Sequence, residues 1–209
     1  ETTWVDSKND SIIEYALVKF DENTFEELDR LEWLINPWFS IPEIISNITN
    51  IFDDDVKDAP LWNNDIIFKI TEFIWDLPII WHNTAFDRDF LLNNWVEIQE
   101  NIVLDTFVLS NIILLEEKSL NLWSLLSSYW IELYWAHRAI NDVLWTIKLF
   151  EKLTVAFRSL SKDNKDLINY IFSNSNEKSF LYYKNFFEFD KIIIKPEEFI
   201  KKILKDIKK

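Results

Sequence analysis

The residues with the clearest potential for chemistry are two histidines and three carboxylates in three separate short segments. Only two histidines occur in the 209 residues, His82 and His137. Each is followed five positions later by an aspartate, Asp87 and Asp142. Glu1 supplies a third carboxylate. Carboxylate oxygens suit Mg²⁺ or Mn²⁺, and a neutral histidine can take a proton from water near neutral pH.

This combination is typical of metal-assisted hydrolysis. Two divalent cations about 4 Å apart can bind the attacking and the leaving oxygen of a phosphodiester. The net charge of −14 argues against a protein that binds nucleic acid through a broad basic face. Bound cations would supply positive charge at such a site instead. A single aspartate or histidine is more often a surface or structural residue, so the prediction rests on the joint pattern.

The elements that must position these residues alternate between strands and helices. Segments 11–20 and 25–35 are predicted strands joined by a hairpin turn at 21–23. Short apolar strands are expected at 77–80 and 102–104, and helices over 42–50, 63–74, 86–92, 105–115, 119–129 and 139–153. This order predicts an α/β domain. Because His137 and Asp142 are not stacked on one helical face, they converge only if His137 lies on the loop before the last of these helices.

Composition also bears on location and on domain organisation. The sequence has no cysteine, which fits a reducing compartment. Its apolar runs are far shorter than the ~18 residues of a membrane span. We therefore expect a cytoplasmic protein without a membrane partner. After about Thr154 the sequence becomes polar and then aromatic-rich. We predict a domain over 1–153 and a mainly helical C-terminal extension over 154–209, with a strand at 192–194 and a basic helix at 196–209.

Three segments resemble the exonuclease motifs of the DnaQ-like, DEDDh family. They are Glu1-Thr2-Thr3, the sequence HNTAFD at 82–87 and the sequence HRAINDV at 137–143. Further agreement comes from Asn36-Pro37, Ile41-Pro42, residues 56–60 and residues 104–106. The family includes the proofreading epsilon subunit of bacterial replicative polymerase and the exonuclease domain of PolC-type polymerases. The resemblance covers about residues 1–153 and implies an RNase H-like mixed β-sheet flanked by helices.

The resemblance also implies roles for individual residues. Glu1, Asp87 and Asp142 would be ligands of two Mg²⁺ or Mn²⁺ ions, and His137 would be the general base. The residues expected near the 3′-terminal nucleotide are Thr2, Thr3, His82, Asn83 and Phe86. The family's first motif has an aspartate two positions before Glu1. The sequence does not contain that position, nor most of the family's first, central strand.

The implied activity is 3′→5′ exonuclease hydrolysis at a DNA 3′ end. A single-stranded DNA 3′ end is the expected substrate, and proofreading beside the catalytic subunit of a DNA polymerase is the expected role. Two alternatives stay open. A member of the same family could trim RNA instead. A non-catalytic nucleic-acid-binding or polymerase-accessory module would apply if the first aspartate of the motif is absent.

The tryptophans of the sequence occupy unusual positions. There are 11 tryptophans and no glycine. Six tryptophans stand at family glycine positions or in predicted turns, where glycine is favoured because it adopts positive φ freely: Trp4, Trp38, Trp81, Trp95, Trp130 and Trp135. At one further family glycine position stands Asn50, and asparagine tolerates that conformation. We hypothesise that these tryptophans are glycines encoded by UGA, a codon that some bacterial lineages read as glycine.

Overall fold

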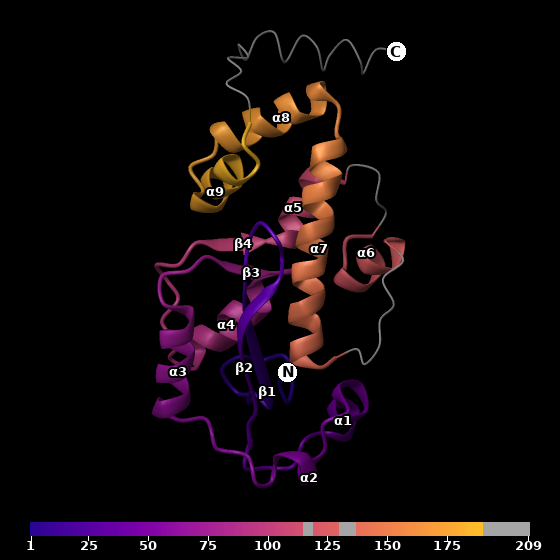
Figure 1. Ribbon diagram of the computed structural model, residues 1–209. Helices are drawn as coiled ribbons and strands as arrows, with labels where there is room; N and C mark the ends of the chain where they lie inside the picture. Colours follow the sequence, from indigo (N-terminus) through magenta and orange to yellow (C-terminus); the bar gives the residue numbers. More distant parts are fainter. Residues whose placement is uncertain (115–118, 130–136, 190–209) are drawn as a thin grey trace.

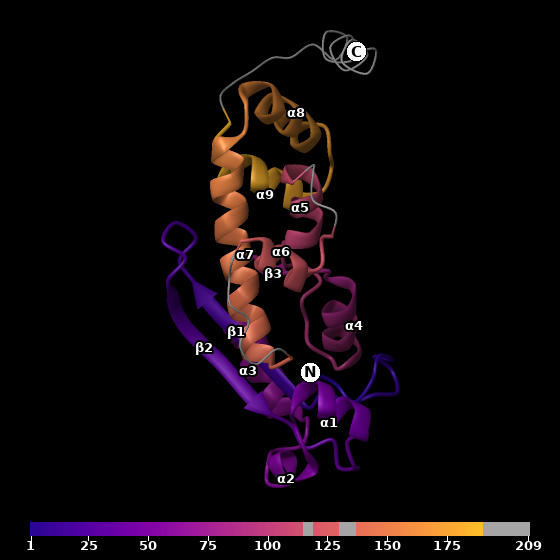
Figure 2. The same cartoon turned by 90° about the vertical axis from the view of Figure 1, so that its right-hand side faces the viewer.

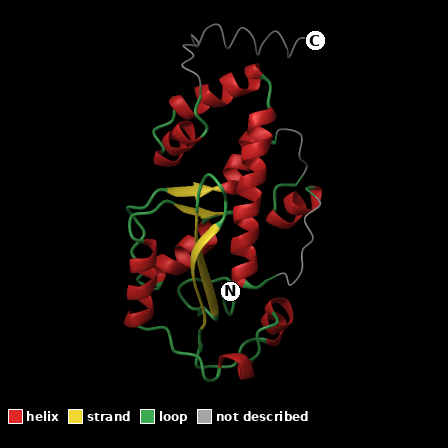
Figure 3. Ribbon diagram, in the orientation of Figure 1, coloured by secondary structure: helices red, strands yellow, loops and turns green. Residues whose placement is uncertain are grey.

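The computed structural model of the chain describes residues 1–114, 119–129 and 137–189. Within these ranges, two small β-sheets are surrounded by helices (Figures 1 and 3). Strands β1 (Glu14–Phe20) and β2 (Glu27–Leu34) form an antiparallel hairpin, and β3 (Ile79–Trp81) and β4 (Val103–Asp105) form a parallel pair. The predicted α/β class is confirmed. The two sheets are separate from each other in the described residues.

Nine helices occur in the described ranges. They are α1 (Glu43–Thr49), α2 (Asp53–Val56), α3 (Asn64–Ile74), α4 (Ala85–Asn93), α5 (Thr106–Ile113), α6 (Leu122–Ser128), α7 (Ala139–Ser159), α8 (Lys162–Ser173) and α9 (Lys178–Phe186). The long helix α7 packs against β1, α5 and α6 (Figure 2). Its buried residues recur every three or four positions, which is the pattern of a helix with one apolar face. In the part of the chain described, no helix is both long enough and apolar enough to cross a membrane.

The predicted boundary between domain and extension falls inside α7, which continues to Ser159. Beyond it, α8 and α9 contribute Ile168, Phe172 and Tyr183 to the same buried cluster as Leu109 of α5 and Leu153 of α7. Both helices agree with the predicted helical character of this region. The division into two parts stays a prediction, and the strand and basic helix expected after residue 189 lie outside the described residues.

Three tryptophans have a backbone conformation that favours glycine. Trp38 and Trp95 have φ of 59° and 67°. Trp75 has φ 49° and ψ −126°, as at the first central position of a type II′ turn, where glycine dominates. A left-handed conformation costs a residue with a Cβ about 1–2 kcal/mol. The side chains of Trp38, Trp95 and Trp75 are 84 %, 81 % and 72 % exposed respectively, so little packing offsets this cost.

The glycine hypothesis is supported at some of its positions and not at others. The sequence predicted glycine-like backbone at Trp38 and Trp95, and both have positive φ. Asn50, at φ 54°, ends α1 in the left-handed conformation. Trp75 is a further position that the sequence did not single out. Trp4 and Trp81 are not among the residues with positive φ, and Trp81 lies within β3. Trp130 and Trp135 lie outside the described residues.

We predict that Trp75→Gly raises the free energy of unfolding by about 1 kcal/mol, because it removes a strained Cβ and an exposed indole. The matched control is Trp33→Gly. Trp33 is 50 % exposed, but it lies in β2 opposite Tyr15. Glycine weakens a strand interior, so the control should lower the same free energy by about 1 kcal/mol. Urea denaturation measures both. Destabilisation by Trp75→Gly would contradict the interpretation.

A second prediction concerns the residues that the native organism inserts. If the UGA hypothesis holds, peptides of the native protein that span positions 38, 75 and 95 contain glycine there. Tandem mass spectrometry of the protein isolated from its source measures this directly. Phe25 also has positive φ but is not a tryptophan, and it serves as the internal control that should be found unchanged. Tryptophan at all three positions would refute the hypothesis.

Candidate functional site

Three elements bring the predicted residues together. The Glu1 segment lies beside the start of β1, where the Glu1 carbonyl accepts the N–H of Ile13 at 2.9 Å. Asp87 lies in the first turn of α4, and Asp142 lies in the first turn of α7. The chain's N-terminus is next to the N-terminal end of α7 in both views (Figures 1 and 2). The first turns of the two helices and the N-terminal segment therefore form one candidate site.

Asp142 has a strongly perturbed carboxyl group. Burial raises its pKa to about 7, and the nearby carboxylates of Glu1 and Asp87 add to the increase. Its Oδ1 atom is buried and has no hydrogen-bond partner among the described residues. A buried carboxylate oxygen without a partner is costly, and a cation would satisfy it.

Asp87 is electrostatically linked to the same group. Protein packed around its carboxyl group raises its pKa, and Glu1 and Asp105 raise it further, although the residue as a whole keeps an exposed surface. Glu1, Asp87 and Asp142 are therefore neighbours whose negative charges oppose one another. This donor set fits a hard divalent cation. Even so, no three metal-binding side chains in the described ranges are grouped closely enough to form a complete metal site.

His137 lies just before Arg138, the capping residue of α7. The sequence predicted this place, because His137 and Asp142 can converge only if His137 lies on the loop before the helix. Its backbone is left-handed, with φ 61°. Its half-buried ring lies against Trp123 of α6, with ring centroids 5.1 Å apart. Partial exposure leaves the imidazole accessible to solvent, which a general base needs. Its role as the base stays a prediction.

His82 has a different environment. Its Nε2 lies 2.9 Å from the Leu120 carbonyl, and its Nδ1 lies 2.9 Å from the Thr106 hydroxyl. Because a carbonyl only accepts, we assign the proton to Nε2. Burial lowers the pKa of His82, which favours the neutral ring. Both nitrogens are thus engaged within the protein, so the predicted nucleotide contact would have to use the face of the ring.

A carboxylate at the end of β4 holds the loop between His82 and α4. Asp105 accepts the N–H of Asn83 at 3.0 Å and the N–H of Thr84 at 3.1 Å, and it also accepts the Thr84 hydroxyl. These hydrogen bonds, together with one from Phe107, outweigh burial and lower the pKa of Asp105. Asn83 has φ 65°, so the loop makes a tight left-handed turn. Asp105 thereby fixes the backbone that leads into α4.

The other residues expected near a nucleotide are placed differently from one another. Thr3 is buried, and its hydroxyl accepts the N–H of Ser11 at 2.9 Å. The Thr2 hydroxyl donates to the carbonyl of Trp4. Phe86, in contrast, is 41 % exposed at the start of α4, with its ring 4.9 Å from that of Phe90. Phe86 is therefore available to stack against a base, whereas the two threonine hydroxyls already have protein partners.

Reasoning from the sequence missed the roles of two charged residues of the site, Glu14 and its partner Arg138. Glu14 lies in β1 and is only 6 % exposed, and its carboxylate binds Arg138 and the start of α7. A signal was present, because Glu14 is a charged residue within the apolar segment 11–20. Buried charges are normally paired, so such a residue predicts a partner. The sequence did not identify the partner, which lies 124 positions away.

Comparison with known proteins agrees with this geometry. The profile of the exonuclease family RNase_T matches residues 1–150, and the chain belongs to this family. It therefore carries a nuclease domain.

The relatives found are polymerases and a nuclease. The chain is 33 % identical over 180 residues to the "DNA polymerase III PolC-type" proteins of Staphylococcus haemolyticus and Staphylococcus aureus. The match covers 84 % of this chain but 12 % of each relative, so the chain spans about an eighth of their length. A solved structure of exonuclease X in complex with 5′ overhanging duplex DNA has the same fold. It matches with a TM-score of 0.56 and 18 % identity, over 74 % of this chain and 89 % of that one.

The raised pKa of Asp142 predicts how stability depends on pH in the absence of metal. An unfolded aspartate titrates near pH 3.9, whereas Asp142 in the folded chain titrates near 7. The folded state therefore binds more protons between about pH 4 and pH 7, so the free energy of unfolding should fall as pH rises through that window. Asp142→Asn should flatten the slope.

Urea denaturation in EDTA from pH 5 to pH 8 measures the effect. The control is Asp89→Asn, because Asp89 is an exposed aspartate on α4. The control should keep the slope of the unchanged chain. An equal slope in the unchanged chain and in Asp142→Asn would contradict the predicted burial of this carboxyl group.

Proposed function

We propose that this chain is a 3′→5′ exonuclease that hydrolyses phosphodiester bonds at DNA 3′ ends. One observation carries the proposal. In a chain of the exonuclease family, the buried Oδ1 of Asp142 lacks a hydrogen-bond partner among the described residues, and the carboxylates of Glu1 and Asp87 are close enough to raise its pKa. Such an arrangement is unfavourable without a cation and suits one that binds divalent metal.

Glu1, Asp87 and Asp142 would hold two Mg²⁺ or Mn²⁺ ions. When bound, these ions would stabilise negative charge on the oxygens of the phosphodiester. The carboxylates on α4 and α7 both lie in first turns, where the partial positive charge of a helix N-terminus favours their ionised form. The two helix N-termini thus offset part of the increase in pKa that burial causes.

The remaining residues would act on the water and on the nucleotide. His137, solvent-accessible at the start of α7, would take the proton from the attacking water. The exposed ring of Phe86 would stack on the terminal base. Asn83, fixed in its turn by Asp105, would contact the same nucleotide. These contacts would orient a frayed 3′ end and would require no broad basic surface.

Proofreading beside a polymerase is part of the proposal. The PolC-type relatives are named as polymerases, and this chain matches about an eighth of their length. We therefore propose that the chain acts next to a DNA polymerase catalytic subunit. RNA trimming and a non-catalytic accessory role are the alternatives that the following experiment separates.

We predict that the chain, with Mg²⁺ or Mn²⁺, shortens a 5′-labelled single DNA strand stepwise from its 3′ end. His137→Ala combined with Asp142→Ala should lower the rate at least about 10²-fold, because general-base catalysis alone contributes that much. EDTA should stop the reaction. The control variant is Glu72→Gln, an exposed residue on α3, and it should keep the full rate.

A matched RNA strand and a DNA strand blocked at its 3′ end complete the assay on denaturing gels. Faster degradation of RNA would favour the RNA-trimming alternative. Tight binding of DNA without degradation would favour the accessory module. Full activity in the double variant would refute the assigned site.

A further inference from the structure

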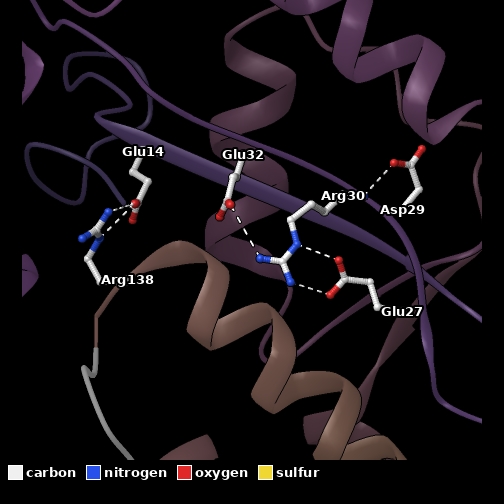
Figure 4. Close-up of polar contacts among 6 residues, drawn as sticks. All are labelled: Glu14, Glu27, Asp29, Arg30, Glu32 and Arg138. Carbon is white, nitrogen blue, oxygen red and sulfur yellow. Dashed lines mark hydrogen bonds and ion pairs between the residues drawn. The ribbon is translucent and has the colours of Figure 1, made fainter.

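Two arginines bind glutamates close to β1 and β2, and the contacts differ in what they connect (Figure 4). Arg138 donates from Nε at 2.9 Å and from Nη2 at 2.6 Å to Oε1 of Glu14. Arg30 donates from Nε to Oε1 and from Nη2 to Oε2 of Glu27, three positions away on the same strand. The Glu27 side chain is 34 % exposed, whereas the Glu14 side chain is 7 % exposed. The second pair is a surface contact, and the first joins distant parts of the fold.

The Glu14 carboxylate also completes the N-terminal end of α7. Arg138 stands at the capping position but forms no side-chain cap. Instead, the Ala139 N–H donates to Oε2 of Glu14 at 2.7 Å. The first N–H groups of a helix have no partner within the helix, so this bond replaces the missing cap. Because its two oxygens have different partners, Glu14 restricts both the distance of α7 from β1 and its rotation.

The backbone of Glu14 contacts the Glu1 segment at the same point. The Glu14 N–H donates to the Glu1 carbonyl at 3.3 Å, and the Glu14 carbonyl accepts from the Glu1 nitrogen at 2.7 Å. One residue therefore touches two of the three segments that carry predicted metal ligands. Its main chain holds Glu1, and its side chain holds the helix turn of Asp142.

We propose that Glu14 is a positioning residue that sets Glu1 and the first turn of α7 in register. With Arg138 as its partner, it keeps Glu1, Asp142 and His137 in a fixed relation. This inference rests on the proposed function. Glu14 itself touches no reacting atom in this scheme. A buried charge keeps its partner because separation would leave the charge unpaired, so the contact is suited to holding a catalytic geometry.

The test compares Glu14→Gln with the matched variant Glu27→Gln. Glutamine preserves size and can still accept the Ala139 N–H, but it removes the charge that binds Arg138. A displacement of about 1 Å at a reacting group can cost about 10²-fold in rate. We expect Glu14→Gln to lower kcat about 10- to 100-fold and to leave KM for single-stranded DNA within about twofold. Glu27→Gln should leave both constants within about twofold.

A second measurement does not depend on activity. Hydrogen exchange followed by mass spectrometry should show faster exchange over 139–142 in Glu14→Gln than in the unchanged chain or in Glu27→Gln. All measurements are made well below the thermal midpoint of every variant, which circular dichroism establishes. Under these conditions a merely structural role would lower the midpoint and leave kcat of the folded protein unchanged.

The outcomes separate the two proposals. If the unchanged chain is active and Glu14→Gln keeps its kcat within about twofold, the positioning role is overturned. If the unchanged chain degrades no nucleic acid, the proposed function fails, and exchange alone decides on Glu14. Unchanged exchange over 139–142 in Glu14→Gln would then overturn the inference, and faster exchange confined to this turn would support it.

Discussion

A carboxylate that is buried must keep its partners, and at Glu14 this requirement connects the parts of the candidate site. The residue lies in an apolar strand, binds Arg138 and Ala139 through its side chain, and binds Glu1 through its backbone. Strand β1 thereby becomes the common reference for the N-terminal segment and for α7. Asp105, at the end of β4, has a similar function, because it holds the turn at Asn83 that precedes α4. Neither residue needs to touch a substrate to determine where Asp87 and Asp142 lie.

The opposite constraint applies to the carboxylates that are proposed to bind metal. Glu1 raises the pKa values of Asp87 and Asp142, Asp87 also raises that of Asp142, and Asp142 retains a buried oxygen without a partner among the described residues. Glu14 and Asp105 are satisfied by the protein, whereas Asp142 keeps one buried oxygen that is not. This contrast separates structural carboxylates from candidate ligands in a chain with a net charge of −14. It also fits a nuclease domain in a chain of strongly negative net charge, since bound cations would provide the attraction for phosphate.

Two groups of described residues with positive φ contrast with each other. At Asn83 the conformation is held by hydrogen bonds to Asp105, and at His137 it directly precedes the helix that carries Asp142. Such strain is common at functional sites, where the surroundings hold it in place. At Trp38, Trp75 and Trp95 the side chains are largely exposed, and packing provides no compensation. The strain at these three positions is therefore better explained by a tryptophan that stands where glycine fits than by a function of the positions.

The order of strands and helices, the exonuclease motifs and the position of His137 before α7 could all be read from the sequence. These features depend on local periodicity and on short spacings, which neighbouring residues determine. The partners of Glu14 and of His82 could not be read in this way. Arg138 is 124 positions from Glu14, and Leu120 is 38 positions from His82. Likewise, only the folded chain places α8 and α9 in the same core as α5 and α7. Pairing of buried polar groups and packing of distant apolar faces depend on how the elements meet in space, so the tertiary structure alone decided them.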